Sequence, residues 1–285
     1  MNAANQGTLL PRDFPALLKE IPDPPERLWH VGDLAATHGP AVAIVGSRRC
    51  SRYGRDMAFG LAEQVAGRGV TVVSGLAFGV DVAAHRGALS AGGRTVAVMA
   101  GGLDRIYPAA HAPLARQIVD SRGALVTEYP PAATPRKHHF PARNRLVSGL
   151  CLGVVVVEAA PKSGSLITAR MALEQNREVM AVPGMATSAL SKGCHRLIRD
   201  GAALIETIED IAEAIGLAWP EEAPHAEPAE LDDPVLAAVG AQTTSADAIV
   251  SATGLAVDEV LGRLVELEVA GFVTAGGGGY SRRPS

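Results

Sequence analysis

Glycine-rich turns with small polar or cationic residues follow several apolar runs of this sequence. Such turns present backbone N–H groups and helix N-termini, which are suited to binding phosphate. Four of them are Gly46-Ser47-Arg48-Arg49, Ser74-Gly75-Leu76-Ala77-Phe78-Gly79, Gly101-Gly102-Leu103-Asp104-Arg105 and Lys162-Ser163-Gly164-Ser165. A single glycine can serve only a tight bend, but four such turns in one basic region predict a phosphate-binding crevice.

The segment 135–145, PRKHHFPARNR, has a composition suited to single-stranded nucleic acid. It holds four cations and two histidines around one aromatic residue, Phe140, and it contains no acid. Cationic grooves with aromatic platforms bind the phosphates and bases of single strands. The alternative is a solvated basic loop, since runs of charge usually face water. The aromatic ring within the charge favours binding.

Residues that could catalyse a reaction are sparse. Acid–base candidates near the turns are Asp81, Asp104, Glu158, His85 and His195. Structural roles are the alternative, because carboxylates at helix starts usually cap the helix. The sequence has no Ser/His/Asp order, G-x-S-x-G elbow, metal-ligand cluster or P-loop, and no G-x-G-x-x-G after its first apolar run. We therefore expect no catalytic residue, no metal and no cofactor.

Apolar runs alternate with helical segments from residue 41 onward. The runs cover 41–45, 70–74, 94–100, 124–128, 151–159, 178–184 and 202–205, with helices predicted at 53–68, 80–90, 111–122, 165–176 and 207–215. Continuous Val, Ile and Ala runs are typical of strands buried on both faces of a parallel sheet. A closed eight-unit barrel usually takes about 250 residues, more than this region holds. We predict an open, doubly wound α/β sheet with the turns at its carboxyl edge.

The charge changes sign along the chain. Residues 1–40 carry net −2, residues 41–199 net +11 and residues 200–285 net −13. A basic centre followed by an acidic tail indicates a polyanion partner for the centre only.

The composition predicts four segments: a lead-in at 1–40, a sheet domain at 41–217, an acidic Pro/Ala linker at 218–230 and a winged-helix domain at 231–285. The prediction of a winged helix rests on three short helical segments followed by a two-strand ribbon.

No apolar stretch is long enough to span a membrane, and the start lacks an export pattern. Three sparse cysteines (Cys50, Cys151 and Cys194) indicate a reducing compartment. We expect a cytoplasmic protein in which Cys194 is buried.

Long motifs follow one another across nearly the whole chain, among them AIVGSRRCSRYG (43–54), SGLAFGVDVAAHRGAL (74–89), GGLDRIYP (101–108), HFPARNRLVSGL (139–150) and GCHRLIRDGA (193–202). In this order they resemble the DNA-processing protein A family (DprA, also called Smf). The resemblance implies an extended Rossmann-like domain that binds single-stranded DNA, forms a homodimer and loads the RecA recombinase onto incoming DNA in natural transformation. It implies no catalysis.

Carried over by motif, the resemblance assigns DNA contacts to Gly46, Ser47, Arg48, Lys137, Phe140, Arg143, Asn144, Arg145, Ser163, Gly164 and Ser165. Lys137 is expected at a phosphate and Phe140 at a base. Two positions depart from the family pattern: Phe78 stands where a cation or small polar residue is usual, and His195 stands at an amide position. The acidic winged helix favours a protein contact or a packing role over DNA binding.

A different function remains open on the residues alone. Related Rossmann-like folds with glycine-rich phosphate cradles include nucleoside-monophosphate phosphoribohydrolases, which process nucleotides. Such an enzyme needs a base at the ribose, and Glu158 and Asp81 are the candidates.

Overall fold

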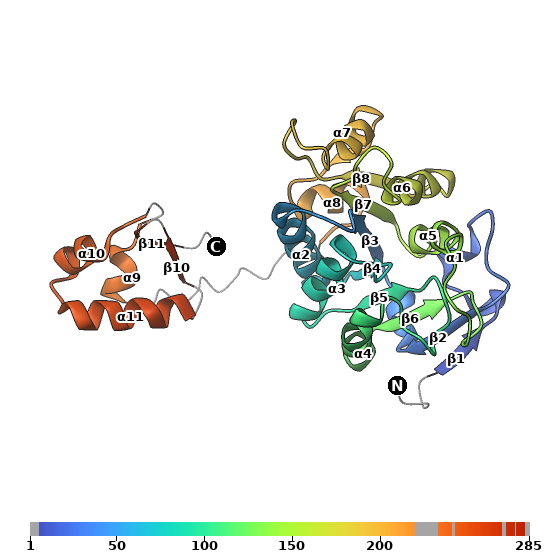
Figure 1. The fold of residues 1–285 in the computed structure, drawn as a ribbon, viewed down its shortest axis with the longest axis horizontal. Coiled ribbons are helices and arrows are strands. Elements are labelled where there is room, and N and C mark those ends of the chain that lie inside the picture. Colours follow the sequence, from blue (N-terminus) through green and yellow to red (C-terminus); the bar gives the residue numbers. More distant parts are fainter. Residues whose placement is uncertain (1–5, 220–232, 241–242, 270–271, 277, 283–285) are drawn as a thin grey trace. The chain divides into compact units, whose positions relative to one another are not determined.

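A nine-stranded sheet organises the first of the two structural units of this chain (Figure 1). The computed structural model describes residues 6–219, 233–240, 243–269, 272–276 and 278–282. The chain divides into a first unit, residues 1–220, and a second unit, residues 221–285. The predicted linker at 218–230 lies almost wholly outside the described residues.

The strands of the sheet lie in the order β1-β2-β6-β5-β4-β3-β7-β8-β9. Their bounds are β1 (Gln6–Leu9), β2 (Leu28–Gly32), β3 (Ala41–Gly46), β4 (Thr71–Ser74), β5 (Thr95–Val98), β6 (Ala124–Thr127), β7 (Gly153–Val157), β8 (Glu178–Ala181) and β9 (Ala203–Leu204). In the described sheet only β2 runs in the opposite direction, so the pairs β1–β2 and β2–β6 are antiparallel and all the others are parallel. The predicted mostly parallel, doubly wound α/β sheet is confirmed.

The order of the strands reverses between β3 and β7. From β3 the chain builds outward through β4, β5 and β6, and from β7 it builds the other way through β8 and β9. At such a switch point the connecting segments leave in opposite directions, which opens a crevice at the carboxyl ends of the strands. The geometry of the sheet therefore places a ligand site beside the ends of β3 and β7.

Helices cover both faces of the sheet (Figure 1). They are α1 (Ala16–Lys19), α2 (Arg52–Gly67), α3 (Val80–Ser90), α4 (Ala112–Asp120), α5 (His139–Gly149), α6 (Ser165–Glu174), α7 (Lys192–Arg199) and α8 (Ile208–Ala214). Because side chains alternate along a strand, Ala43 and Val45 of β3 join the core with α5 and α6, whereas Val42 and Ile44 join the core with α2 and α3. Burial on both faces explains the uninterrupted apolar runs.

Five elements differ from the sequence-based expectation, and one of them is the short helix α1 in the 1–40 segment. Strands β1 and β2 extend the sheet with residues of the 1–40 segment, for which no strand was predicted. The basic segment 135–145 contributes most of α5 and is therefore largely helical. Helix α7 was likewise not predicted.

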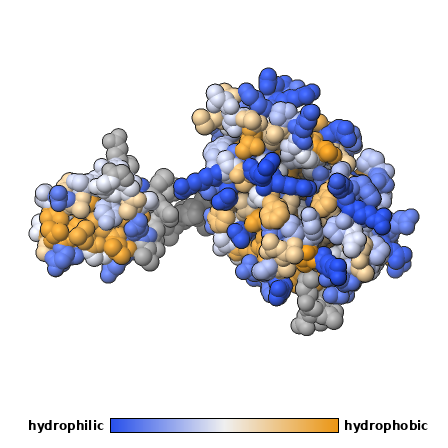
Figure 2. Space-filling view, viewed as in Figure 1, coloured by the Kyte–Doolittle hydropathy of each residue, from blue (hydrophilic) through white to orange (hydrophobic). Residues whose placement is uncertain are grey.

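The second unit has its own small core. Helices α9 (Pro234–Ala238), α10 (Ala246–Thr253) and α11 (Val257–Val269) are followed by the hairpin of β10 (Val273–Gly276) and β11 (Gly279–Arg282). Buried side chains of all three helices and of β10 pack together. This is the order of a winged helix, as predicted. Hydrophobic side chains gather on the face of this unit that Figure 2 presents.

Within the described ranges, no helix combines the length and the apolar composition that crossing a membrane requires.

Candidate functional site

A cleft of about 600 Å³ lies at the switch point of the sheet. It gathers the turns after β3 and β7, the loop after β4 and one side of α5. Among the residues predicted to contact DNA, those that line it are Gly46, Ser47, Arg48, Phe140, Arg143, Asn144, Ser163, Gly164 and Ser165. Residues separated by more than 100 positions therefore share one concave surface.

The turn after β3 is fixed by its neighbours. A Cβ atom at Gly46 would overlap the backbone of Val157 on β7, so only glycine fits there. The backbone N–H of Ser47 donates to the Glu158 carbonyl at 2.7 Å, and the Ser47 carbonyl accepts from the Val80 N–H at 3.2 Å. The turn is thus held between β7 and α3, and these contacts fix the backbone that carries Arg48.

The loop after β4 is held by two buried charges. The carboxylate of Asp81 accepts from the backbone N–H groups of Gly75 and Ala77, both at 3.1 Å. The guanidinium of Arg143 donates to the Gly75 carbonyl at 2.8 Å and to the Val98 carbonyl. Only 7% of Asp81 and 4% of Arg143 is exposed. Both side chains therefore position the loop from beneath the cleft.

Burial shifts the titration of this pair. It raises the pKa of Asp81 although Arg143 and the two N–H donors favour the carboxylate. It lowers the pKa of Arg143 to about 10, against the attraction of Asp81. Arg143 therefore stays charged at neutral pH and contributes positive potential to the floor of the cleft.

The turn after β7 leads into α6 with open backbone. Gly164 is the N-cap and makes no side-chain capping bond, and a Cβ atom there would meet nothing. The hydroxyls of Ser163 and Ser165 lie 2.8 Å apart, and the Asn144 amide donates to the Gly164 carbonyl at 3.4 Å. A helix N-terminus flanked by hydroxyls is suited to an oxyanion.

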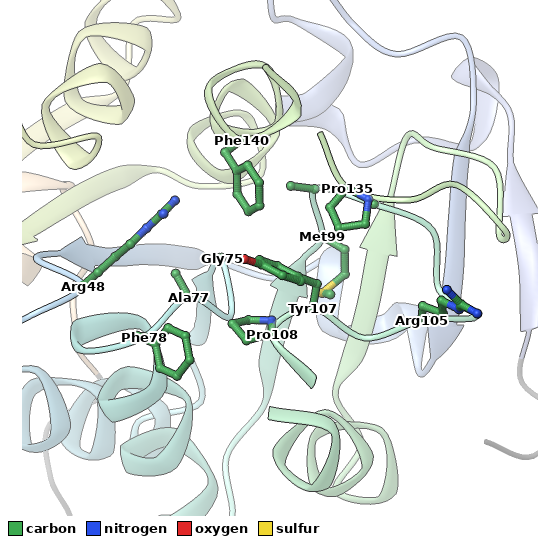
Figure 3. Close-up of a pocket in the computed structure, with 12 residues that line it drawn as sticks. Arg48, Gly75, Ala77, Phe78, Met99, Arg105, Tyr107, Pro108, Pro135 and Phe140 are labelled. Atoms are coloured by element: carbon green, nitrogen blue, oxygen red, sulfur yellow. The ribbon is translucent and has the colours of Figure 1, made fainter. Parts of the chain in front are cut away.

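Phe140 projects from α5 beside a second, smaller hollow of about 50 Å³ (Figure 3). Its ring meets Tyr107 edge to face, with centroids 5.8 Å apart. The guanidinium of Arg48 lies 5.2 Å from the Phe140 centroid, within the range of a cation–π contact. Phe140 also lines the larger cleft, so one aromatic ring borders both.

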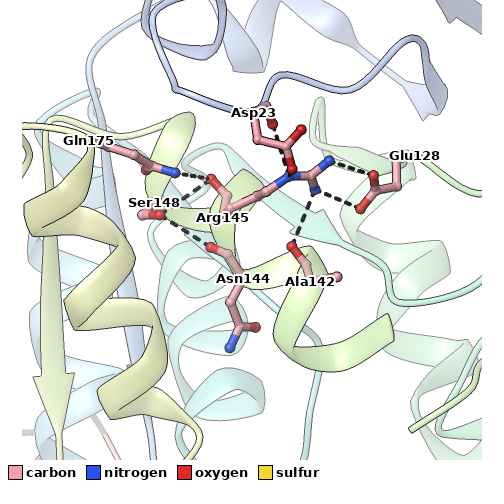
Figure 4. A network of polar contacts seen from close by, with 7 residues as sticks. All are labelled: Asp23, Glu128, Ala142, Asn144, Arg145, Ser148 and Gln175. Carbon is pink, nitrogen blue, oxygen red and sulfur yellow. Dashed lines mark hydrogen bonds and ion pairs between the residues drawn. The ribbon is translucent and has the colours of Figure 1, made fainter. Parts of the chain in front are cut away.

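Two of the predicted contact residues, both in the basic segment, lie outside the cleft lining. Lys137 is exposed and precedes α5. Arg145 faces a different set of partners (Figure 4): both terminal nitrogens bind the Glu128 carboxylate at 2.7 Å, and Nε binds Asp23 at 3.0 Å. Burial disfavours its charge, but these carboxylates raise the pKa of Arg145 above its ordinary value. Arg145 ties α5 to the segment after β6.

The candidate acid–base groups are occupied by structural contacts, with the exception of Asp104, which is exposed. Glu158 accepts from the backbone N–H of Ser51 at 2.7 Å and from its hydroxyl at 2.5 Å. His85 is fully buried, with Nδ1 2.7 Å from the Thr95 hydroxyl. The His195 ring lies against the Gly184 carbonyl at 3.0 Å. Cys194 is buried, as predicted, and burial raises its pKa to about 11.

The cleft has two cationic residues that were not among the predicted contacts. Arg49 and Lys162 both line it. They directly adjoin the predicted groups Gly46-Ser47-Arg48 and Ser163-Gly164-Ser165. Neither has an ion-pair partner among the described residues. Both belong to the glycine-rich turns identified in the sequence, so treating every cation of those turns as a contact would have included them. The described residues contain no group of acidic, His or Cys side chains that would hold a metal.

A doubly wound sheet with an arginine-bearing cleft at its switch point, followed by a winged helix, defines a two-unit class of Rossmann-like proteins. The family described as DNA recombination-mediator protein A matches residues 7–216, and the DprA winged helix domain matches residues 220–279. This chain belongs to the DNA recombination-mediator protein A family.

Its relatives match over most of their length. Protein Smf of Escherichia coli is 44% identical over 96% of this chain and 77% of its own. The DNA processing protein DprA of Streptococcus pneumoniae is 44% identical over 70% of each chain.

Two solved structures share the fold. DprA of Streptococcus pneumoniae superposes with a TM-score of 0.68 at 42% identity, over 73% of each chain. DNA processing protein A of Helicobacter pylori superposes with a TM-score of 0.66 at 33% identity, over 73% of this chain and 94% of its own. The latter structure is described in terms of a unique single-stranded DNA binding mode.

Proposed function

We propose that this protein binds single-stranded DNA in the cleft at the switch point, catalyses no reaction, and loads RecA recombinase onto that DNA during natural transformation. The observation that carries the binding step is the cleft itself. Arg48, Arg49 and Lys162 line it without an ion-pair partner among the described residues, beside the aromatic ring of Phe140. Unpaired cations next to an aromatic platform are the chemistry of single-strand binding.

Each part of the site has a separate task in this proposal. The turn at Gly46-Ser47-Arg48 and the serines of Ser163-Gly164-Ser165 bind phosphates. Asn144 lies beside the serines, because its amide donates to the Gly164 carbonyl. Lys137 binds a further phosphate from its exposed position, and Phe140 stacks on a base. Arg143 and Arg145 position α5 and the loop after β4.

The proposed assembly starts from the family description, which is that of a recombination mediator. We propose RecA recombinase as the partner and a homodimer through the first unit. We also propose a cytoplasmic location and the segment boundaries given above. The acidic second unit suits a protein contact better than DNA.

The alternative is a phosphoribohydrolase-like enzyme that uses Glu158 or Asp81 as the base. Both carboxylates already accept two hydrogen bonds from nearby protein groups. Freeing either one would release the start of α2 or the loop after β4. These contacts favour a binding protein.

A titration with oligothymidylate tests the proposal. We expect tight binding with a steep salt dependence, and no hydrolysis of nucleoside monophosphates. Arg48→Ala is expected to weaken binding of every sequence about equally, because phosphate contacts carry no base information. Its salt slope should be shallower by about 0.7, the value of one phosphate contact on a single strand.

Arg170→Ala is a matched control, because Arg170 is exposed and pairs with Glu174 at 3.5 Å on α6. It should leave both affinity and slope unchanged. An Arg48→Ala protein with unaltered binding would refute the assignment of the cleft, and turnover of a nucleotide would favour the enzyme.

A further inference from the structure

A further hollow of about 520 Å³, distinct from the cleft and from the small hollow beside Phe140, lies on the opposite side of the turn after β3, between α2 and α3. Its lining includes four arginines, namely Arg48, Arg49, Arg55 and Arg86, together with Phe78. No Asp or Glu lines it among the described residues. We call this hollow the α2–α3 groove.

The arginines of the α2–α3 groove are set apart by their number around one hollow that no described acid lines. Some exposed arginines on the helices pair with an acid one turn away, as Arg52 does with Asp56, Arg170 with Glu174 and Arg196 with Asp200, each at 3.5 Å. Arg55 and Arg86 are exposed, and neither has an ion-pair partner among the described residues. Like charges that surround one hollow repel each other, and an anion in the hollow relieves that repulsion.

The α2–α3 groove continues from the cleft. Arg48 and Arg49 line both hollows, so the turn that carries them is the ridge between the two. Gly79 packs closely against this ridge: a Cβ atom there would overlap the Ser47 carbonyl and press on that of Arg48. A ligand that lies along the cleft therefore reaches the groove by crossing two arginines.

An aromatic ring lies on the far side of this ridge. Phe78 is 50% exposed, and its ring meets His111 edge to face with centroids 4.6 Å apart. Large apolar side chains are usually buried, so an exposed ring among unpaired arginines points to a ligand with both phosphates and flat bases. A nucleic acid strand has both.

We infer that a single strand bound in the cleft continues over Arg48 and Arg49 into the α2–α3 groove, where Arg55 and Arg86 bind its phosphates and Phe78 lies against a base. This inference rests on the proposed function, because it extends the path of the same strand. It predicts a longer site than the cleft alone provides.

Two lengths of oligothymidylate separate the cleft from the groove. Single-strand grooves hold roughly 4–16 nucleotides, so we choose oligomers of about 6 and about 16 nucleotides. The double variant Arg55→Ala, Arg86→Ala should bind the short oligomer as the wild type does. With the long oligomer it should bind more weakly, and its salt slope should be shallower by about 1.4, since each lost phosphate contact accounts for about 0.7.

A control removes the same charge elsewhere. The double variant Arg12→Ala, Arg116→Ala loses two exposed arginines outside both the cleft and the α2–α3 groove, and it should bind both oligomers as the wild type does.

Unchanged binding of the long oligomer by the Arg55→Ala, Arg86→Ala protein would overturn the inference and leave an acidic protein segment as the occupant of the groove. Equal losses for both lengths would also overturn it, because the arginines would then serve the cleft. If the wild type binds neither oligomer, the proposed function itself fails.

Discussion

Phe140 is placed to combine two kinds of contact within one site. The ring borders the cleft and the smaller hollow, while Arg48 lies over its face and Tyr107 meets its edge. The side chain is half-buried, so part of the ring is accessible to a base. Lys137 lies three residues earlier, and it is exposed and unpaired among the described residues. One residue can thus act by stacking and the other by charge.

Substitution should separate these two effects. Phe140→Ala is expected to weaken binding of oligothymidylate by about 1–3 kcal/mol with an unchanged salt slope, because stacking depends little on salt. Lys137→Ala should reduce the slope by about 0.7, because it removes a phosphate contact. Titrations at several salt concentrations measure both quantities.

Conservative variants distinguish stacking from packing at Phe140. Phe140→Tyr should retain binding, whereas Phe140→Leu should not, since leucine fills space without a flat face. The melting temperature of each variant is measured in parallel. If Phe140→Leu restores both binding and stability, the ring is an anchor for α5 and the stacking role is wrong.

Arg143 and Arg145 illustrate what the sequence can and cannot predict about a residue. Their type and spacing indicate cations near a phosphate site, and the structure does place Arg143 in the lining of the cleft. The sequence does not reveal that Arg143 donates to two buried carbonyls, nor that Arg145 binds Glu128 and Asp23. These partners lie 17 to 122 positions away along the chain. They become neighbours only once the sheet has formed.

At the scale of elements, the central strands were predictable because both of their faces are buried. Strand β7, within the run at 151–159, holds only glycine and valine, since it has α5 and α6 on one side and α2 on the other. Strand β1 was not predictable in this way. It is a four-residue edge strand with no fully buried side chain, so it lacks the apolar run that marks the inner strands.

Helix α5 escaped prediction for a different reason. Its buried positions include His139, Arg143, Leu146 and Val147, which follow helical spacing. Two of these four side chains are polar, so the hydrophobic pattern that normally reveals a helix is incomplete. Pro141 lies in the first turn, where the absence of an N–H costs nothing. Of these four buried side chains, Arg143 and Val147 line the cleft.

Helix α3 makes the stability of the first unit depend on pH through His85. Burial, together with the positive charge of Arg143, lowers the pKa of His85 to about 3 from a usual value of 6.5. Between these two values the unfolded chain takes up a proton that the native His85 does not. His85 should therefore make the free energy of unfolding fall by about 1.4 kcal/mol per unit as the pH drops below 6.5.

Denaturant titrations between pH 4 and 7 test this dependence. Both tryptophans, Trp29 and Trp219, lie in the first unit, so their fluorescence reports its unfolding. His85→Gln keeps a polar group that can reach the Thr95 hydroxyl but cannot titrate, and the pH dependence should be weaker by the stated slope. The midpoint at pH 7 serves as the control for any general loss of stability. Equal pH dependence in the two proteins would show that His85 is protonated at its usual pKa in the native state.

At the scale of the whole molecule, charge is divided between the two units. Residues 1–220 carry net +4 and residues 221–285 carry net −8. In the second unit the guanidinium of Arg263 is already bound to Asp233 and Glu266. Helix α11 exposes Val257, Leu261 and Val265 instead of cations. Such a surface is poorly suited to phosphates, which a DNA-reading helix must contact.

Removal of the second unit should therefore not weaken DNA binding. A protein truncated after Pro220 keeps Trp219, which packs against the core of the first unit, and we expect it to fold. Its affinity for oligothymidylate should equal or slightly exceed that of the full chain at low salt, because eight net negative charges no longer oppose the strand. The difference in affinity should vanish near 0.1 M salt, where screening acts over about 10 Å.

Tryptophan fluorescence confirms folding of the truncated protein, and titrations at two salt concentrations measure the affinity. A large loss of affinity in the folded, truncated protein would contradict this expectation and assign DNA binding to the winged helix.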